Sequence, residues 1–332
     1  MAGSPPSDAD WMAAAARLAM RARPASRPNP GVGAILVRDE RVVATGWTQD
    51  GGRPHAEAAM LAKLSPDAAA GATLYVTLEP CAHASPRGPA CADLVAAASP
   101  ARVVIGQHDP DPRTAGSGIA RLEAAGIAVS VIEDESSANS LAGYLMRRRA
   151  GRPHVTLKLA QSLDGRIALA DGSSRWITGE IARAHCHARR ARADAILVGG
   201  GTWRADAPRL DVRLPGLEPR SPQRVVLTRG AAPDGVHAID RPEAIADLAG
   251  VQYLYVEGGA RVAASFLAAD LVDELHLYQA PIVIGGDGVA AIGALDLGDL
   301  AAAHGRWRLA ESRQLGSDRF SAYHRARTRS FA

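Results

Sequence analysis

The feature that most constrains the fold is a set of three potential zinc ligands that lie far apart along the chain. His55 is followed two positions later by Glu57, and the thiols of Cys81 and Cys91 come further on. One imidazole and two thiolates suit tetrahedral zinc, and they leave a fourth position open for water. A fold that uses all three ligands must bring three separate segments to one point.

Glu57 gives this ligand set a chemical interpretation. A carboxylate beside a ligand, but not itself a ligand, can accept a proton from zinc-activated water and deliver it to a departing amine. His-x-Glu followed by Pro-Cys is typical of zinc nucleobase deaminases, although nine residues rather than two separate Cys81 from Cys91 here. The alternative is a structural zinc site or no metal, and the adjacent Glu57 favours catalysis.

The segments around these residues alternate between strand and helix patterns. We expect a first helix capped by Asp10. Further on, the patterns predict strands at 33–37, 42–47, 73–78, 102–106 and 128–132, and helices at 55–64, from about 91, and at 119–125. This alternation favours an α/β sandwich with a mostly parallel sheet. His55 and Cys91 would then begin helices and Cys81 would follow a strand, so the three could meet at one sheet edge.

A change of character between residues 134 and 153 marks a domain boundary. An acidic run at its start is followed by the basic triplet 147–149, and Gly151-Arg152-Pro153 then breaks the chain. A length of 332 residues also favours two domains, which we place at 9–146 and 152–327. The second half repeats the alternation, with strands at 155–160, 195–199, 224–228, 253–256, 274–279 and 320–324, and helices at 180–191 and 261–268. It is therefore predicted to be another α/β domain.

Longer segments around the ligands closely resemble one enzyme family. These segments are Pro28-Asn29-Pro30-Gly31-Val32-Gly33, His55-Ala56-Glu57, Thr77-Leu78-Glu79-Pro80-Cys81-Ala82-His83 and Gly88-Pro89-Ala90-Cys91. They look like the deaminase half of the bifunctional riboflavin-biosynthesis deaminase–reductase, in which the two cysteines have this longer separation. The resemblance implies that His55, Cys81 and Cys91 bind zinc, that Glu57 is the catalytic proton carrier, and that Asn29 and His83 contact the substrate.

The second half resembles the reductase half of the same family, whose fold is similar to that of dihydrofolate reductase. The matching segments are 158–166, 174–179, 195–202, 206–210 and 256–259. The resemblance implies NADPH contacts by Ala160, Trp176, Thr202, Asp206, Gly259, Ala260, Arg261, Val262, Ala263, Ala264 and Ser265. It implies substrate contacts by Ser174, Arg190, Leu210, Arg213 and Glu257.

The chemistry of several of these residues agrees with such roles. Arg190 and Arg213 can clamp a phosphate, because guanidinium binds phosphate in a bidentate way. Asp206 is a catalytic candidate that could assist opening of a ribose ring, with an ordinary surface aspartate as the alternative. Arg229 follows a predicted strand and could meet the 2′-phosphate of NADPH, or it could be an exposed surface arginine.

Two glycine clusters would support a dinucleotide site. Gly199-Gly200-Gly201 and Gly258-Gly259 each follow a predicted strand, where glycine lets the backbone approach a pyrophosphate and a helix start offers free N–H groups. Neither cluster is a G-x-G-x-x-G fingerprint, so a Rossmann domain is not implied. Simple turns are the alternative for both.

Together the two halves predict a fold class and a function. We expect a cytidine-deaminase-like α/β/α sandwich followed by a dihydrofolate-reductase-like α/β domain. The resemblance implies deamination of a diaminopyrimidinone ribosylamine 5′-phosphate with Zn²⁺, then reduction of its ribosyl group to ribityl with NADPH.

Two rival functions have less support. A nucleic-acid base deaminase with an accessory domain would need a basic channel and stacking aromatics, whereas the net charge is only +3 and aromatics are 4% of residues. Glu57 and Asp206 argue against a non-catalytic sensor.

The setting can also be predicted in outline. The partner is expected to be a small phosphoribosyl pyrimidine, not nucleic acid or a membrane. Only three cysteines and no apolar run near Met1 favour a cytoplasmic protein. The family resemblance makes a homo-oligomer the expected assembly.

Overall fold

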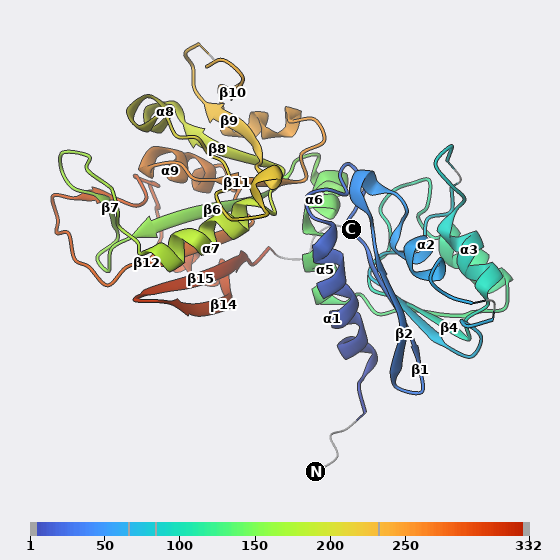
Figure 1. Cartoon of the computed structure of the whole chain (residues 1–332). Coiled ribbons are helices and arrows are strands. Elements are labelled where there is room, and N and C mark those ends of the chain that lie inside the picture. The colour runs from blue at the N-terminus through green and yellow to red at the C-terminus, as the bar shows by residue number, and fades with distance from the viewer. Residues whose placement is uncertain (1–4, 66, 84, 232, 328–332) are drawn as a thin grey trace. The chain divides into compact units, whose positions relative to one another are not determined.

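The computed structural model describes residues 5–65, 67–83, 85–231 and 233–327 (Figure 1). Contacts between residues divide the chain into two compact units, Met1–Gly151 and Arg152–Ala332. Each unit has its own sheet with helices on both faces, so the fold class predicted above is confirmed. In the described part of the chain, no helix is both long enough and apolar enough to cross a bilayer.

The first unit is built on a five-stranded sheet with the order β2-β1-β3-β4-β5. Its strands are β1 Gly33–Arg38, β2 Arg41–Trp47, β3 Thr73–Val76, β4 Arg102–Ile105 and β5 Ala128–Val131. Its helices are α1 Asp8–Ala19, α2 Ala56–Leu61, α3 Cys91–Ala98, α4 Ser117–Ala124, α5 Glu135–Ser140 and α6 Ala142–Ala150, with short 3-10 turns at Met20–Ala22 and Asp50–Gly52. The predicted strands and helices are present, with ends within three residues of those expected.

The expectation of a mostly parallel sheet is only half right in this unit. β3, β4 and β5 are parallel, but β1 runs antiparallel to both β2 and β3. β1 and β2 form a hairpin whose two turn residues, Asp39 and Glu40, both have positive φ, at 48° and 57°. Such a turn matches the twist of paired strands and reverses the chain at once, so β2 becomes an antiparallel edge.

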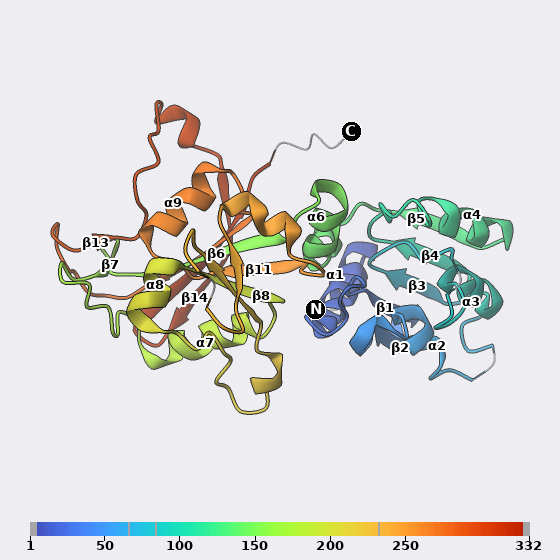
Figure 2. The same ribbon diagram turned by 90° about the horizontal axis from the view of Figure 1, so that it is seen from above.

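Strand alternation gives the first sheet two apolar faces. Ile35 and Val37 point to the face covered by α1, while Leu36 points to the face covered by α2, α3 and α4. Figure 2 shows α1 on one side of this sheet and α2 and α3 on the other. The start of α1 differs from prediction, because the Ser7 side chain is the cap. Asp10 completes a capping box by accepting the Ser7 N–H at 2.9 Å.

The second unit is built on an eight-stranded sheet with the order β10-β9-β8-β11-β6-β12-β15-β14. Its strands are β6 His154–Gln161, β8 Ala195–Gly199, β9 Gln223–Leu227, β10 His237–Ile239, β11 Tyr253–Val256, β12 Glu274–Gln279, β14 Trp307–Leu315 and β15 Asp318–Arg325, and β7 Arg166–Ala168 pairs with β13 Val289–Ala290 as a separate ribbon. The helices are α7 Glu180–Arg190, α8 Gly200–Asp206 and α9 Ala260–Ala268, with 3-10 turns at Glu218–Arg220, Pro242–Asp247 and Ala301–Ala303. The six neighbouring strands β10, β9, β8, β11, β6 and β12 are parallel to one another. β15 and β14 follow β12 in the sheet and are antiparallel.

Each face of this sheet has its own core. Phe266 of α9 packs with Leu157 and Val256 on one face. Cys186 of α7 packs with Tyr255 and Phe320 on the other. Because six strands are parallel, their carboxyl ends share one edge of the sheet, which is where ligands of open α/β sheets bind.

Tight packing at Gly33 leads to a testable prediction about the stability of the first unit. A Cβ at this first residue of β1 would lie 2.0 Å from the Ala15 carbonyl oxygen of α1. Gly33→Ala should therefore destabilise the unit by about 1–3 kcal/mol, as overpacking does. Calorimetry would show one lowered unfolding transition. Gly298→Ala, where a Cβ meets nothing within 4 Å, is the control, and equal transitions in both variants would contradict the close packing.

Candidate functional site

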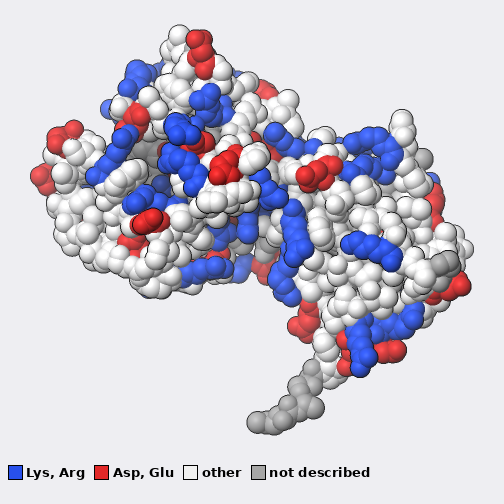
Figure 3. Space-filling model, in the orientation of Figure 1, with Lys and Arg blue, Asp and Glu red and all other residues white. Residues whose placement is uncertain are grey.

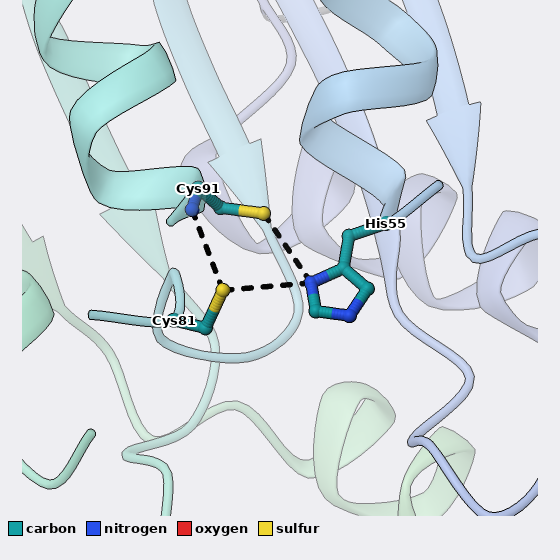
Figure 4. A group of neighbouring side chains, drawn as sticks. All are labelled: His55, Cys81 and Cys91. Atoms are coloured by element: carbon teal, nitrogen blue, oxygen red, sulfur yellow. Dashed lines mark hydrogen bonds between the residues drawn. The ribbon is translucent and has the colours of Figure 1, made fainter. Parts of the chain in front are cut away.

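The three predicted zinc ligands come together in the first unit (Figure 4). His55 is the N-cap residue of α2, Cys91 is the first residue of α3, and Cys81 lies in the loop after β3. The Nδ1 atom of His55 is 3.5 Å from Sγ of Cys81 and 3.3 Å from Sγ of Cys91. All three ligand atoms lie within 4.8 Å of one another.

These distances fit a tetrahedral zinc ion. Zn–S bonds of about 2.3 Å and Zn–N bonds of about 2.0–2.1 Å place nitrogen and sulfur about 3.6 Å apart at the tetrahedral angle. The observed separations of 3.5 and 3.3 Å are close to that value. The donor set and its spacing therefore suit the ion, and three protein ligands leave one position open.

Local electrostatics favours a thiolate at this centre. The thiol of Cys91 donates to Cys81, and the Cys91 backbone N–H lies 3.3 Å from the Cys81 sulfur. These hydrogen bonds lower the pKa of Cys81 to about 4, while that of Cys91 is raised by the same pairing and by burial. A thiolate is the form that binds a metal.

Glu57 lies in the first turn of α2, next to the ligand set, and is only 3% exposed. Burial raises the pKa of its carboxyl, against the lowering effect of the nearby His55 charge. A raised carboxyl pKa moves the group toward the range in which it can both take up and release a proton near neutral pH. The position and environment of Glu57 thus suit a proton carrier.

The two predicted substrate contacts lie on different loops. Asn29 Nδ2 is 3.3 Å from Nε2 of His55 and donates to the Gly52 carbonyl oxygen at 2.9 Å. His83 follows Cys81 by two residues, and its Nδ1 lies 3.5 Å from the Thr114 hydroxyl. The structure thus brings Asn29 directly against a zinc ligand, while His83 contacts Thr114 on the loop before α4.

The second unit contains a cavity of about 610 Å³ at the carboxyl edge of its parallel strands. Its volume is in the range of small-molecule and cofactor sites. It is lined by ten residues predicted to bind cofactor or substrate: Ala160, Trp176, Thr202, Asp206, Gly259, Ser174, Arg190, Leu210, Arg213 and Glu257. The sequence-based predictions thus converge on one site.

The remaining cofactor candidates lie elsewhere. Arg229 lines a separate hollow of about 370 Å³ at the end of β9. Ala260, Arg261, Val262, Ala263, Ala264 and Ser265 belong to α9 and are not among the residues lining the cavity. Val262 and Ala263 pack into the core, so their side chains face away from a ligand. What this segment can offer is the start of α9, where no side chain caps the backbone N–H groups.

Arg190 makes a different contact from the phosphate clamp expected of it. Its Nε and Nη2 atoms bind the two carboxylate oxygens of Glu257 at 2.5 and 2.9 Å, and its Nη1 donates to the Asp211 carbonyl oxygen. Burial alone would raise the pKa of Glu257, but Arg190 and then Lys158 hold it at about 2. The fork of Arg190 is therefore committed to a buried carboxylate in this structure.

Lys158 and His187 line the cavity and were not among the predicted site residues. Lys158 Nζ lies 3.6 Å from a Glu257 oxygen. The sequence contains a signal for it, because Lys158 interrupts the apolar residues of β6 and must point to the opposite face from Leu157 and Leu159. His187 sits one turn before the end of α7, and nothing in the local pattern distinguishes it from an ordinary helix residue.

His187 and Arg213 form a pair of converging donors. The Arg213 backbone N–H donates to His187 Nδ1 at 3.3 Å, so a neutral ring carries its proton on Nε2. Burial, then Arg190 and Arg213, lower the pKa of His187, which favours the neutral ring. Arg213 Nη2 lies 3.3 Å from that Nε2 atom. Arg213 Nη1 also pairs with the Asp211 carboxylate at 3.3 Å, and the Arg213 side chain is about half exposed, so its other N–H groups can reach an anion.

Asp206 and Trp176 mark the open side of the cavity. The Asp206 side chain is 40% exposed, and its nearest cationic partner is Arg175 Nη2 at 3.6 Å. Trp176 is 66% exposed, and the Arg183 guanidinium carbon lies 4.7 Å from the centre of its ring. An exposed indole at a cavity mouth is available for a flat ligand ring.

Comparison with known proteins covers both units. A family model described as the cytidine and deoxycytidylate deaminase zinc-binding region matches residues 5–107, and the RibD C-terminal domain matches residues 153–320. The chain is 37% identical to the riboflavin biosynthesis protein RibD of Escherichia coli, over 94% of this chain and 97% of that protein. It is 38% identical to RibD of Mycobacterium tuberculosis, over 88% and 89%.

Solved structures agree over nearly the whole length. Acinetobacter baumannii RibD is similar with a TM-score of 0.83 and 33% identity, over 96% of this chain and 99% of that one. A diaminohydroxyphosphoribosylaminopyrimidine deaminase/5-amino-6-(5-phosphoribosylamino)uracil reductase from Thermotoga maritima is similar with a TM-score of 0.84 and 28% identity, over the same shares. Both units therefore have counterparts within single relatives.

The ligand geometry predicts how zinc content depends on individual cysteines. Cys91→Ser should lower zinc from one ion per chain to a small fraction, because a neutral hydroxyl replaces a thiolate ligand. Cys186→Ser is the matched control, since this buried cysteine belongs to the second unit. Elemental analysis of the purified proteins measures the difference. Equal zinc in the two variants would contradict the assigned centre.

Proposed function

Because this chain belongs to the RibD family of riboflavin biosynthesis, we propose an assignment of its two reactions to its two units. The chain is a bifunctional enzyme that combines a zinc-dependent deaminase with an NADPH-dependent reductase. We assign the deaminase to residues 9–146 and the reductase to residues 152–327. The observation that carries the assignment is the His55, Cys81 and Cys91 triad beside Glu57 in the first unit.

The deaminase reaction would replace the 2-amino group of a diaminopyrimidinone ribosylamine 5′-phosphate with oxygen. The ring carbon gains an oxygen from water, the C–N bond breaks, and ammonia leaves. A zinc ion held by His55, Cys81 and Cys91 would lower the pKa of a bound water to near neutrality. Glu57 takes up the proton released from water and passes it to the departing nitrogen. Asn29, beside the ligand imidazole, and His83 would orient the pyrimidine.

The reductase reaction would use the 610 Å³ cavity of the second unit. NADPH bound there would supply the hydride that, together with one proton, converts the opened ribosyl group into a ribityl chain at C1′. Ala160, Thr202 and Gly259 line the cavity close to strand ends, where the backbone can approach a pyrophosphate. The uncapped start of α9 offers N–H groups to the same anion. Trp176 and Asp206 would hold the cofactor and ribose at the mouth.

The substrate phosphate fits best between Arg213 and His187. Arg190, which we expected to share this role, is held by Glu257 through two of its nitrogens. Arg213 is also paired, through Nη1 with Asp211 at 3.3 Å, but its side chain is about half exposed and its Nη2 atom lies 3.3 Å from His187 Nε2. We assign Arg190 to holding Glu257 in place, while Ser174, Leu210 and Glu257 line the remaining substrate surface.

Arg229 supports a preference for NADPH. Its hollow also contains Arg241, so two guanidinium groups lie near the end of β9. Two positive charges would favour a 2′-phosphate over a free hydroxyl. Asp240 lines the same hollow and pairs with Arg241 at 3.2 Å, so we assign the 2′-phosphate to Arg229.

The enzyme acts on a small phosphorylated pyrimidine, and the nucleic-acid deaminase alternative is disfavoured by the RibD match. Acidic groups stand among the basic ones on the face shown in Figure 3, in keeping with a net charge of +3. We also propose a cytoplasmic location, supported by three unpaired buried thiols, and a homo-oligomeric assembly, supported only by the family resemblance.

Replacing the proton carrier should separate chemistry from metal binding. Glu57→Gln should reduce ammonia release by roughly 100-fold or more, because general acid–base catalysis contributes about 10²–10⁴. Zinc content and NADPH-dependent reduction of the deaminated substrate should stay at wild-type values. Undiminished deamination would refute the mechanism, and loss of zinc would make Glu57 a ligand instead.

The phosphate assignment predicts a selective binding defect in the reductase. Arg213→Gln should raise KM for the deaminated substrate by roughly 10- to 100-fold, the effect of losing a charged hydrogen bond. With the dephosphorylated substrate, the variant and the wild type should have the same KM. Arg220→Gln, at an exposed arginine of the Glu218–Arg220 turn, is the control. Equal sensitivity of both substrates to Arg213→Gln would place the phosphate elsewhere.

A further inference from the structure

We propose that Glu79 is a positioning residue of the zinc centre. It stands two residues before Cys81, and its carboxylate ties the Pro80-Cys81 turn to the start of α4. The role is to hold the Cys81 sulfur at the distance from His55 and Cys91 that a metal ion needs. This inference rests on the proposed deaminase function of the first unit.

The carboxylate of Glu79 is fully engaged with backbone N–H groups. Oε1 accepts from Gly118 at 3.0 Å and from Ile119 at 3.3 Å. Oε2 accepts from Gly116 at 3.1 Å and from Asp109 at 3.4 Å. Glu79 is only 2% exposed. Four acceptor contacts saturate an ionised carboxylate and fix its orientation.

Glu79 takes the place of an ordinary helix cap. The N-cap residue of α4 is Gly116, which has no side chain to accept the first free N–H groups. The carboxylate of Glu79, in the loop after β3, supplies the acceptor and also lies at the positive end of the helix dipole. The start of α4 and the turn before Cys81 therefore hold each other through one side chain.

Backbone contacts tighten the same connection. The Glu79 backbone N–H donates to the Gln107 carbonyl oxygen at 3.0 Å, in the loop that leads to α4. A Cβ on Gly118 would lie 2.1 Å from the Pro80 carbonyl oxygen. The first turn of α4 is thus packed directly against the peptide that precedes Cys81. Among these contacts, the Glu79 carboxylate is the one made by a side chain. Its loss would therefore release the Pro80-Cys81 turn from α4 at that point.

An amide cannot replace this carboxylate. Glutamine keeps one acceptor oxygen but turns an NH₂ group toward backbone donors. His108 Nδ1 lies 3.9 Å from Oε2 and its side chain is 54% exposed, so it does not substitute for the N–H contacts. Residues that orient metal ligands in this way typically affect metal affinity by about 10- to 100-fold.

A purely structural role makes a different prediction and needs its own variant. Leu122 is a fully buried α4 residue in the apolar core, and it is not one of the residues that donate to the Glu79 carboxylate. Leu122→Ala should weaken α4 packing while leaving Glu79 and its N–H partners in place. Comparing the two variants separates positioning of Cys81 from general stability.

The test uses the full-length protein with Glu79→Gln, Glu79→Asp and Leu122→Ala. Zinc affinity is measured by competition with a chelator, and the ligand field is measured by the absorption spectrum of the cobalt-substituted protein. We expect Glu79→Gln to weaken zinc binding by roughly 10- to 100-fold and to shift the cobalt bands. Leu122→Ala should lower the unfolding temperature but keep both properties. NADPH-dependent reduction of the deaminated substrate reports on the second unit in every variant.

Wild-type zinc affinity and an unchanged cobalt spectrum in Glu79→Gln would overturn the inference, whatever the rate of ammonia release. So would an equal loss of affinity in Leu122→Ala. If Glu79→Gln does not fold, the shorter Glu79→Asp, which withdraws the carboxylate from α4, is judged by the same two readouts. Failure of the proposed function is distinguishable, because zinc-free wild-type protein would then release ammonia at the normal rate.

Discussion

The approach of one imidazole nitrogen to two sulfurs is the contact on which the first unit depends. His55 Nδ1 lies 3.5 and 3.3 Å from the sulfurs of Cys81 and Cys91, and these residues come from two helix starts and a strand end. Such a contact requires the starts of α2 and α3 to face the loop after β3. The sheet order provides this arrangement, because β3 lies at the centre, with α2 and α3 packed on one face. Apolar packing therefore sets the metal geometry, and the buried Glu57 carboxyl acquires its raised pKa from the same enclosure.

The second unit uses a related arrangement with different chemistry. Parallel strands end at a common edge of the sheet. Ala160 lies near the end of β6, Glu257 and Gly259 follow β11, and all three line one cavity. The charge that organises this edge is the Glu257 carboxylate, which binds Arg190 and lies near Lys158. A buried carboxylate of this kind needs paired cations, since an unpaired charge would be costly. In both units, packing of ordinary α/β layers places a few polar groups at strand ends, and those groups carry the function.

Sequence patterns were sufficient for the ligands and most elements but not for several contacts. Alternating or continuous apolar runs located the main strands, and the spacing of His55, Glu57, Cys81 and Cys91 identified the zinc centre. β14 was missed because its residues are mostly exposed and polar, as suits an edge strand, and α8 was missed because it begins with two glycines, which are weak helix formers. The Arg190–Glu257 pair and the turn of His187 toward Arg213 depend on side-chain positions in three dimensions. The cap of α1 by Ser7 rather than Asp10 shows the same limit at the scale of one turn.

The most direct test of the central claim is X-ray absorption at the zinc edge of the purified full-length enzyme. The ligand set predicts two sulfur neighbours at about 2.3 Å and nitrogen or oxygen neighbours at about 2.0–2.2 Å. Such a shell would confirm that His55, Cys81 and Cys91 meet at one ion with a position left open. A shell without sulfur, or with more than two sulfurs, would contradict the account of how this fold builds its deaminase centre.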